Sequence, residues 1–556
     1  MLTPAYINIQ SFFYPIGNTP AISLTQSLPP GGPANILLLG CGDVRNILFT
    51  IRRKLDITCC DNQKAVMARN ALLLSLIIDN DDGRNDNSLW NIYYHMYLDQ
   101  RDLDLLRSQS KMLYEVSTTM ETWQQGKYGR CLSFCDCATL ADVRKMWAFY
   151  SVEQKGAEST RFKGRFQSAL DKAKAKRKNP ANPNQSRINA AGCCSASPAH
   201  IGCLKDLNAL NQHYWKYGTT DLKADIMSTF TYPNPAFLTL GDGALIHYGL
   251  DPLLGFHLAA VDAPLNSATT IVNRLPRREK YAALAQAEFH EWMASYREQC
   301  QRNDVKVRFF IGDAISFAHT LRHKSITSEN TAHWYRDRYG VRPLVLDGPD
   351  YAPGARGPVE FDVIDTSNLC DHLGSLTLLT ATSPLLRDDV SAVLYTEVLA
   401  KNHKDYREVL DQVLCGHVPT LSTLLGLFPV EYWTNTSPIS IGDEMILNTL
   451  MAELSQKQAI SQSGTQMFLR TSWKRALCIG STTTTPSPQR IPIWFDPKLL
   501  SKTLYGVYVH MFLDEDWAHR LSNLDLKSFE KSALVWYQRS SFVSFLRLVQ
   551  TRVTCN

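Results

Sequence analysis

The stretch NILLLGCGDVRNILFT at residues 35–50 decides the fold class of this chain. Its apolar run at 36–39 is too short to cross a membrane and has the length of a strand buried on both faces of a parallel sheet. Gly40 and Gly42 let the backbone turn sharply and approach a ligand, which a Cβ atom would block. Asp43 is expected to cap the helix that follows. Together these features indicate the opening of a βα unit that binds a nucleotide or a cofactor.

The composition is that of an ordinary globular protein, with 556 residues, 44% of them hydrophobic and 20% charged. This length predicts two or three domains. The formal net charge of +5 is too small to indicate nucleic-acid binding. No apolar run has the length of a bilayer span, and the first residues lack the pattern of a secretory signal. The 14 cysteines are therefore expected to be reduced thiols in a cytoplasmic or nuclear protein.

Two groups of cysteines are candidates for a metal site by residue type. Neither has the paired C-x2-C spacing of a zinc site, and neither has a nearby histidine at finger spacing, so no metal site is predicted. The groups are Cys131, Cys135 and Cys137 in one segment and Cys193, Cys194 and Cys203 in another.

Strands and helices are predicted to alternate on both sides of a long insertion. The strand at 54–61 (KLDITCCD) is followed by a helix at 62–78, and the alternation resumes at 305–311 (VKVRFFI). The sequence thus predicts an α/β protein with a Rossmann-like parallel sheet that is split by a mostly helical insertion and followed by a helical C-terminal region. The predicted units are 1–82 and 304–400 for the two halves of the sheet, 83–303 for the insertion and 401–556 for the C-terminal region.

A basic loop is predicted at 161–187, within the insertion. Such a charge run is typical of a solvated helix end followed by a flexible loop, and the alternative is a contact with RNA or an acidic partner. No aromatic residues for base stacking interleave with its lysine-rich part, which argues against nucleic-acid binding.

Polar residues follow three predicted strands at the edge where an open α/β sheet binds its ligand. A carboxylate after the second strand can accept hydrogen bonds from the hydroxyls of a ribose, and one after the next strand can accept from the amino group of adenine. The alternative for each aspartate is a cap on the following helix. The residues predicted to bind an adenosyl cofactor are Gly40, Cys41, Gly42, Asp43, Asp61 and Asp313.

The next strand end, DTSNLCDH at 365–372, is expected to face the reacting group of the ligand. Asp371 and His372 can supply a base there, or they cap and pack a helix. The candidate catalytic residues are Asp365, Asn368, Asp371 and His372.

With these residues, the chain resembles a eukaryotic family of unknown function that includes fungal proteins with a MYND zinc finger. The N-terminal domain of that family is shared with axonemal dynein preassembly factors. The resemblance implies a Rossmann-like domain similar to class I S-adenosylmethionine methyltransferases, with S-adenosylmethionine as the cofactor. The segments that carry it are 12–31, 36–50, 55–74, 246–260, 308–321 and 361–379.

Three departures from the family patterns limit what is transferred. The dense Cys/His cluster of a MYND finger is missing, so finger functions are not expected. Class I methyltransferases usually carry an acidic residue two places before the first glycine, where this chain has Leu38. Arg45 replaces the third glycine of a dinucleotide fingerprint, which argues against a pyrophosphate-binding NAD site. Arg45 either pairs with Asp43 or neutralises an anionic ligand group.

The sequence thus leaves two functions open. The first is an S-adenosylmethionine-binding, methyltransferase-like protein of unknown acceptor. The second is a non-catalytic interaction or assembly factor on the same scaffold, with a protein partner bound through the helical region at 401–556. Neither reading includes a membrane.

Overall fold

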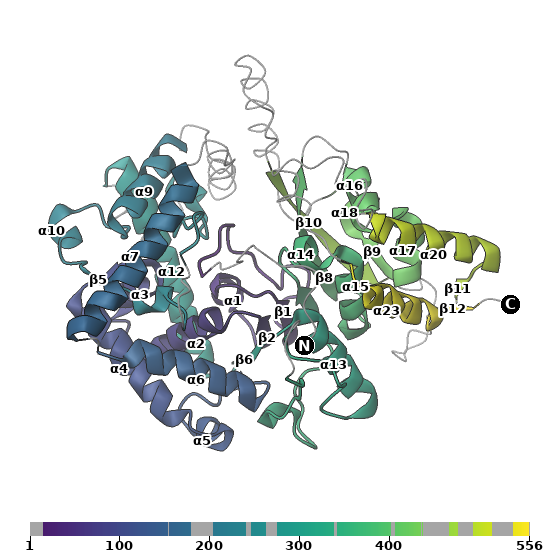
Figure 1. The fold of residues 1–556 in the computed structure, drawn as a ribbon, viewed down its shortest axis with the longest axis horizontal. Coiled ribbons are helices and arrows are strands. Elements are labelled where there is room, and N and C mark those ends of the chain that lie inside the picture. Colours follow the sequence, from purple (N-terminus) through teal and green to yellow (C-terminus); the bar gives the residue numbers. More distant parts are fainter. Residues whose placement is uncertain are drawn as a thin grey trace, which may run out of the picture.

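A computed structural model gives a mixed α/β architecture around one central sheet (Figure 1). The structure describes residues 15–153, 155–178, 204–240, 246–262, 275–337, 342–401, 406–434, 436, 466–475, 493–513 and 537–554. The sheet has eight strands and is mostly parallel. In spatial order the strands are β4 (Leu132–Phe134), β6 (Val305–Ile311), β2 (Leu55–Asp61), β1 (Ala34–Leu39), β7 (Val363–Asp365), β8 (Val393–Lys401), β10 (Gln466–Arg475) and β9 (Leu427–Pro429).

The order of the strands reverses beside β1. From β1 the chain continues to β2 and then to β6 on one side, and the later strands β7 and β8 lie on the other side. These five strands are parallel to one another, and β10 is antiparallel to both of its neighbours. The carboxyl ends of β1, β2, β6, β7 and β8 therefore lie at one edge of the sheet, with the reversal point between β1 and β7.

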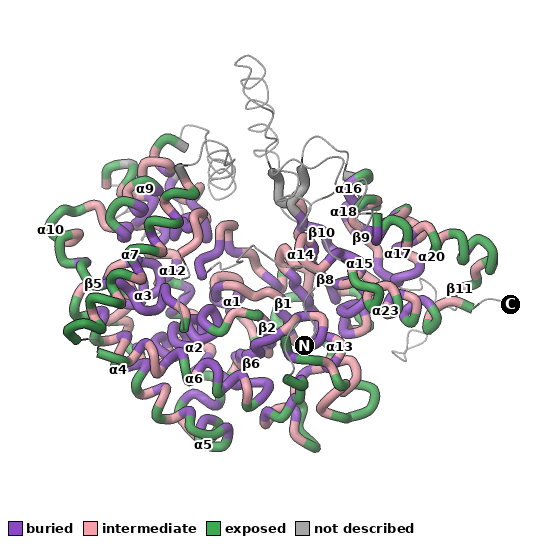
Figure 2. Tube along the Cα trace, viewed as in Figure 1, coloured by how far each residue is buried: buried purple, intermediate pink, exposed green. Residues whose placement is uncertain are grey.

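Both faces of the sheet are buried, because β1, β2, β6, β7 and β8 each send side chains into two different hydrophobic cores. Ile36 and Leu38 of β1 belong to one core, and Leu37 and Leu39 belong to the other. Figure 2 shows the buried strands at the centre of the molecule. The first core is covered by α1 (Arg45–Thr50), α2 (Lys64–Asp79), α3 (Asp86–Tyr94), α4 (Gln100–Val116), α6 (Cys137–Ser151) and α12 (Arg277–Gln301), and the second by α13 (Ala314–Thr327), α15 (Ser375–Thr382), α17 (Val418–Leu425), α20 (Pro497–Met511) and α23 (Arg539–Gln550).

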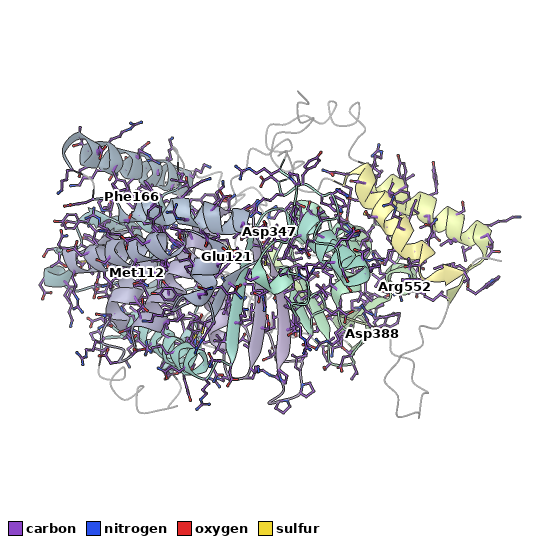
Figure 3. All side chains as sticks on the ribbon, turned by 90° about the horizontal axis from the view of Figure 1, so that it is seen from below. Met112, Glu121, Phe166, Asp347, Asp388 and Arg552 are labelled. Atoms are coloured by element: carbon purple, nitrogen blue, oxygen red, sulfur yellow. The ribbon has the colours of Figure 1, made fainter. Side chains whose placement is uncertain are left out.

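The other helices and two small sheets lie around this frame. Figure 3 shows Met112 and Phe166 of the insertion on one side of the central sheet and Arg552, next to α23, on the other. These elements are α5 (Met120–Gln125), α7 (Gly156–Lys178), α9 (Leu204–Tyr217), α10 (Ala224–Met227), α14 (Cys370–Leu373), α16 (Tyr406–Val413) and α18 (Val430–Thr434), with β3 (Tyr97–Leu98) paired to β5 (Tyr232–Pro233) and β11 (Ile493–Trp494) paired to β12 (Val553–Thr554).

The insertion and the C-terminal region add strands that the sequence did not indicate. The predicted helical insertion supplies β4, which pairs with β6 at the edge of the sheet. The region beyond residue 400, also predicted to be helical, supplies β9 and β10. A three-residue strand such as β4 or β9 is too short to show periodicity. The strand β10 lacks a continuous apolar run, and its buried Arg470 is paired with Glu397 of β8.

The predicted basic loop is partly helical. Its residues 161–178 lie in α7, and residues 179–187 lie outside the described residues, as do Cys193, Cys194 and Cys203. At the end of α7 the guanidinium group of Arg177 lies 4.4 Å from the ring centre of Trp215 and donates to the backbone oxygen of Tyr248 at 2.9 Å. This arginine therefore has a structural role.

The described residues contain neither a membrane-spanning helix nor a cluster of metal ligands. No helix among them is long and apolar enough to cross a membrane. No group of three or more His, Cys, Asp or Glu side chains among them could hold a metal ion.

A substitution at Leu37 tests whether the second hydrophobic core covers its face of the central sheet. Leu37 is fully buried in β1, so Leu37→Ala should lower the free energy of unfolding by about 3 kcal/mol through lost contacts and the cavity left behind. Ile326→Ala on α13, where the side chain is 71% exposed, should change it by less than about 0.5 kcal/mol. Urea unfolding followed by circular dichroism measures both variants. Equal effects would contradict the described packing.

Candidate functional site

The turn after β1 lies at the reversal point of the sheet and is held by hydrogen bonds to β2. Gly40 and Gly42 both have left-handed backbone angles, with φ of +66° and +55°, which favour glycine. The N–H groups of Gly40 and Cys41 both donate to the backbone oxygen of Cys60, at 2.8 and 3.1 Å. The glycines thus give the chain the sharp bend that the sequence predicted.

Asp61, the last residue of β2, lies against this turn. Its Oδ2 accepts from the N–H of Gly42 at 3.2 Å, and its Oδ1 accepts from the N–H of Gln63 at 2.9 Å. Burial raises the pKa of Asp61 to about 6 although these hydrogen bonds favour the ionised form. The residue remains partly exposed, and a carboxylate has about four acceptor positions, so it can still accept from a ligand.

A chain of hydrogen bonds from α2 and α3 holds the other side of the turn. Asn70 donates through Nδ2 to the backbone oxygen of Gly42 at 2.6 Å. The hydroxyl of Tyr93 donates to Asn70 at 2.9 Å and accepts from the N–H of Val44 at 3.4 Å. The N–H groups of residues 40–42 therefore all donate to acceptors of this chain, which leaves none for an anionic ligand.

Asp43 does not cap the following helix, contrary to the prediction. The N-cap of α1 is Val44, which makes no side-chain cap bond, and Asp43 contributes to that helix end only a long hydrogen bond of 3.4 Å from the N–H of Arg45 to its Oδ1. Instead, the buried Asp43 carboxylate accepts from the N–H of Gly17 at 2.6 Å and forms an ion pair of 2.5 Å with Arg45. Of the two roles considered for Arg45, the structure shows the pairing with Asp43.

Residues 15–32 form a strap over α1, which Asp43 helps to anchor. Arg45 donates to the hydroxyl of Thr19 at 2.8 Å, and Thr50 on α1 accepts from the N–H of Leu24 at 2.9 Å. Farther along, the hydroxyl of Ser27 lies 2.8 Å from the hydroxyl of Tyr395 on β8. The strap therefore connects the two halves of the sheet.

Asp313 follows β6 at the same edge and caps α13. Its Oδ1 accepts from the N–H and the hydroxyl of Ser316, at 2.8 and 3.0 Å. The capping alternative is thus realised. Its Oδ2 has no hydrogen-bond partner among the described residues, and the residue is partly exposed. Gly312 donates to the backbone oxygen of Asp61 at 3.0 Å, which places these two strand ends side by side.

On the other side of β1, Asp365 is buried in an ion-pair cluster. Its Oδ2 accepts from Arg470 of β10 at 2.5 Å, and the same guanidinium group donates to Glu397 of β8 at 2.7 Å. Arg470 and Asp365 have side chains exposed by only 4% and 7%. The cluster joins three strands, so it fixes this half of the edge.

Ser367, two residues beyond Asp365, has a left-handed backbone with φ of +47°. Its N–H donates to Oδ1 of Asp365 at 2.8 Å, and its oxygen accepts from the N–H of Glu397 at 2.9 Å. A non-glycine residue in this region is strained, and the cluster supplies the contacts that hold it. Such strain is frequent near functional sites.

The turn from Ser367 to α14 contacts the glycine turn through Leu369. A Cβ atom on Gly40 would lie 2.9 Å from Cγ of Leu369, so this leucine occupies the space beside Gly40. Asn368 is partly exposed, and its backbone oxygen accepts from the N–H of Asp371 at 3.0 Å. Asp371 and His372 lie on α14, and burial lowers the pKa of His372 to about 4.

Cys41 is no candidate nucleophile. Its contact with Cys59, together with burial, raises the pKa of the Cys41 thiol well above its ordinary value. The reactive form of cysteine is the thiolate, so this thiol stays unreactive at neutral pH.

The structure thus brings all ten predicted residues to one edge, but in two distinct settings. The glycine turn, Asp61 and Asp313 offer partly exposed acceptors, whereas Asp43 and Asp365 are buried in ion pairs. The sequence did not indicate the supporting residues; all but Leu369, which lies within the segment 365–372, are outside the strand ends singled out above. They are Asn70, Tyr93, Leu369, Glu397 and Arg470.

One comparison with known proteins gives a match. A family model described as a domain of unknown function (DUF4470) matches residues 15–98. No curated protein and no solved structure matches this chain. The matched range begins at the strap and ends at β3, so it includes β1 and β2 but none of the other strands of the central sheet.

The anchoring role of Asp43 can be tested against an exposed pair. Asp43→Asn should lower the free energy of unfolding by about 3 kcal/mol, because Arg45 loses its partner charge in a mostly buried place. Asp82→Asn, which breaks the exposed pair with Arg84, should cost less than about 1 kcal/mol. Chemical denaturation measures both variants, and limited proteolysis should show faster cleavage within 15–32 in Asp43→Asn alone. Unchanged cleavage would contradict the anchoring.

Proposed function

We propose that this chain binds S-adenosylmethionine or S-adenosylhomocysteine at the carboxyl ends of β1, β2 and β6. The observation that carries the proposal is the partly exposed carboxylate of Asp61, hydrogen-bonded to the glycine turn at the reversal point of the sheet. The five strands β6, β2, β1, β7 and β8 are third, second, first, fourth and fifth in chain order when β4 at the edge is set aside. That order is the one of doubly wound Rossmann sheets, which bind ligands at the reversal point.

The available groups fit the adenosyl part of such a cofactor. The oxygens of Asp61 would accept from the ribose hydroxyls, and the unpartnered Oδ2 of Asp313 would accept from the adenine amino group. The turn at Gly42 would let the ligand approach the backbone closely. A pyrophosphate needs free N–H groups, and residues 40–42 have none, so a dinucleotide fits less well.

A bound cofactor of this class would supply an electrophilic methyl group, and the segment 367–372 would face the acceptor. Burial lowers the pKa of His372 to about 4, so its ring is neutral at pH 7, the form that a general base needs. The ion pairs of Arg470 with Asp365 and Glu397 would hold this segment in position. Such positioning matters because much of the catalysis of a methyl transfer lies in orienting the reactants.

A second candidate is a non-catalytic assembly factor on the same scaffold. Two features favour it, because both reduce the room or the groups left for a cofactor. Leu369 fills the space beside Gly40, and Asp313 uses one carboxylate oxygen to cap α13. The resemblance to MYND-finger proteins and dynein preassembly factors supports this reading too. The nine described cysteines are all free thiols, which supports a cytoplasmic or nuclear place for either function.

Calorimetric titration with S-adenosylmethionine and S-adenosylhomocysteine tests the first candidate. The wild-type chain should bind at least one of them. Asp61→Asn should weaken binding about tenfold or more, because hydrogen bonds to a charged acceptor are lost, and Gly42→Ala should weaken it by straining the turn. Asp104→Asn on the exposed face of α4 is the matched control and should bind as the wild type does. If neither compound gives heat of binding or a thermal shift, cofactor binding is excluded and the assembly factor remains as the proposed function.

The pH dependence of binding tests the role of Asp61 directly. Ribose hydroxyls favour the ionised carboxylate, so binding should lower its pKa from about 6 and release a proton at lower pH. The affinity should be greatest above pH 6 and fall by up to about tenfold per pH unit below it. Titrations from pH 5 to 8 measure this, and in Asp61→Asn the dependence should disappear. An equal dependence in that variant would assign the titration to another group.

A further inference from the structure

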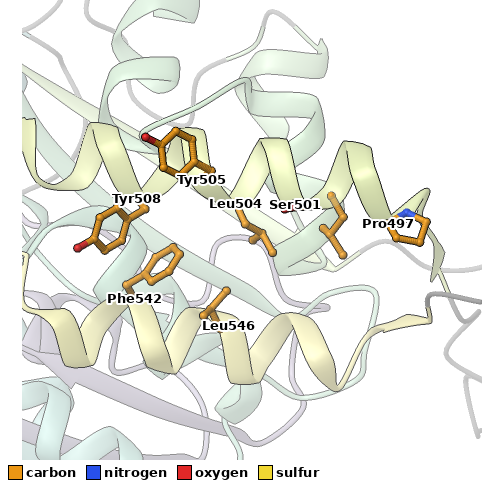
Figure 4. Close-up of a pocket in the computed structure, with 8 residues that line it drawn as sticks. Pro497, Ser501, Leu504, Tyr505, Tyr508, Phe542 and Leu546 are labelled. Carbon is orange, nitrogen blue, oxygen red and sulfur yellow. The ribbon is translucent and has the colours of Figure 1, made fainter.

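A groove lies between α20 and α23, and none of its lining residues belongs to the strand ends or turns of the candidate site. Figure 1 shows the two helices beside each other. The groove has a volume of about 490 Å³, and Figure 4 shows Leu504 and Tyr508 of α20 facing Phe542 and Leu546 of α23. The rings of Tyr508 and Phe542 are 5.1 Å apart at their centres. The groove is lined by Pro497, Leu500, Ser501, Leu504, Tyr505, Tyr508, Phe542 and Leu546.

The two helices are fixed to the molecule by other faces. Val507 and Met511 of α20 and Phe545 and Leu548 of α23 are buried in the second core. Of the groove lining, Leu500 belongs to this core and Leu504, Tyr508 and Phe542 pack against its edge, so the groove is a partly open margin of the core. The lining also includes Tyr505, whose exposed fraction is 70%. An apolar hollow with an exposed aromatic side chain at its rim is typical of an interaction site.

The titratable side chains that α20 and α23 themselves carry, apart from tyrosine, are all basic. Neither helix contains an acidic residue, and Asp496 before α20 uses its side chain as the N-cap. A second depression, of about 550 Å³, shares Pro497, Ser501 and Tyr505 with the groove and is also lined by Lys498 and Lys502. These two lysines have no ion-pair partner among the described residues. The basic residues of the two helices are Lys498, Lys502, His510, Arg539 and Arg547.

We propose that this groove binds an acidic amphipathic helix of a partner protein. Its lining from 497 to 508 spans about 17 Å at 1.5 Å per helical residue, which matches about three turns of a bound helix. Such a helix would place apolar residues at i, i+3, i+4 and i+7 in the groove and its acidic residues beside Lys498 and Lys502.

Charge and shape favour this occupant over two others. A second copy of the same face would bring lysines against lysines, which is repulsive. An anionic membrane surface also suits a basic apolar face, but a hollow between two helices fits a convex rod better than a flat bilayer.

A peptide-display selection on the full-length chain tests the proposal. The library displays peptides of about four helical turns, and counter-selection uses Tyr505→Glu, whose 70% exposed side chain can change without unfolding α20. The selected peptides should share apolar positions at helical spacing together with Asp or Glu. They should bind the wild-type chain, and Tyr505→Glu about tenfold more weakly, in a fluorescence anisotropy titration.

Charge reversal separates groove binding from general attraction. Lys498→Glu/Lys502→Glu should weaken binding of the selected peptides about tenfold, because two attractions become repulsions. The matched control, Lys163→Glu/Lys172→Glu, makes the same change on exposed residues of α7 and should leave binding unchanged. Thermal unfolding confirms that each variant is folded.

Three outcomes would overturn the proposal. The first is no enrichment, or peptides of basic or neutral consensus. The second is binding of the chain to phosphatidylserine vesicles that Tyr505→Glu abolishes, with no selected peptide, which would assign the face to a membrane. The third is a dimer of the wild-type chain that Tyr505→Glu separates into monomers.

Discussion

Burial of the central sheet on both faces is the constraint on which the other features depend. Alternate side chains of β1 enter two separate cores, so neither face of the sheet is open to a ligand. The central sheet can therefore bind a ligand only at the edge where the parallel strands end, and at this edge the backbone turns directly after β1. Gly40 and Gly42 make that turn with left-handed angles, and the end of β2 supplies both the acceptors and the carboxylate that hold it.

The edge is asymmetric about β1, and the asymmetry has a chemical meaning. On the side of β2 and β6 the carboxylates of Asp61 and Asp313 keep acceptor capacity near solvent. On the side of β7 the charges are neutralised inside the protein by Arg470, a residue of the antiparallel strand β10. The first half suits recognition of a polar ligand, and the second half suits the rigid support of a neighbouring segment. Leu369 lies where the two halves meet.

The central strands were predictable because their apolar runs are continuous. The predicted strand 305–311 is β6, and β2 begins one residue after its predicted start. The convergence of the strand ends followed from topology. The partners of the carboxylates did not, because Arg470 and Asp365 are 105 positions apart and neither belongs to a motif. Asp43 was predicted to be a helix cap, but its carboxylate accepts from the N–H of Gly17 in the strap. This is a tertiary contact, which the local spacing of residues does not reveal.

A crystal structure of the full chain with S-adenosylhomocysteine tests most directly whether the glycine turn, Asp61 and Asp313 form a cofactor site. We expect electron density for the nucleoside beside Gly42. The ribose hydroxyls should donate to the Asp61 carboxylate, and the adenine should lie near Asp313. We also expect that Leu369 moves or contacts the ligand while the Arg470 cluster stays intact. Crystals grown with saturating compound that show no density there, with Leu369 still against Gly40, would contradict the cofactor site.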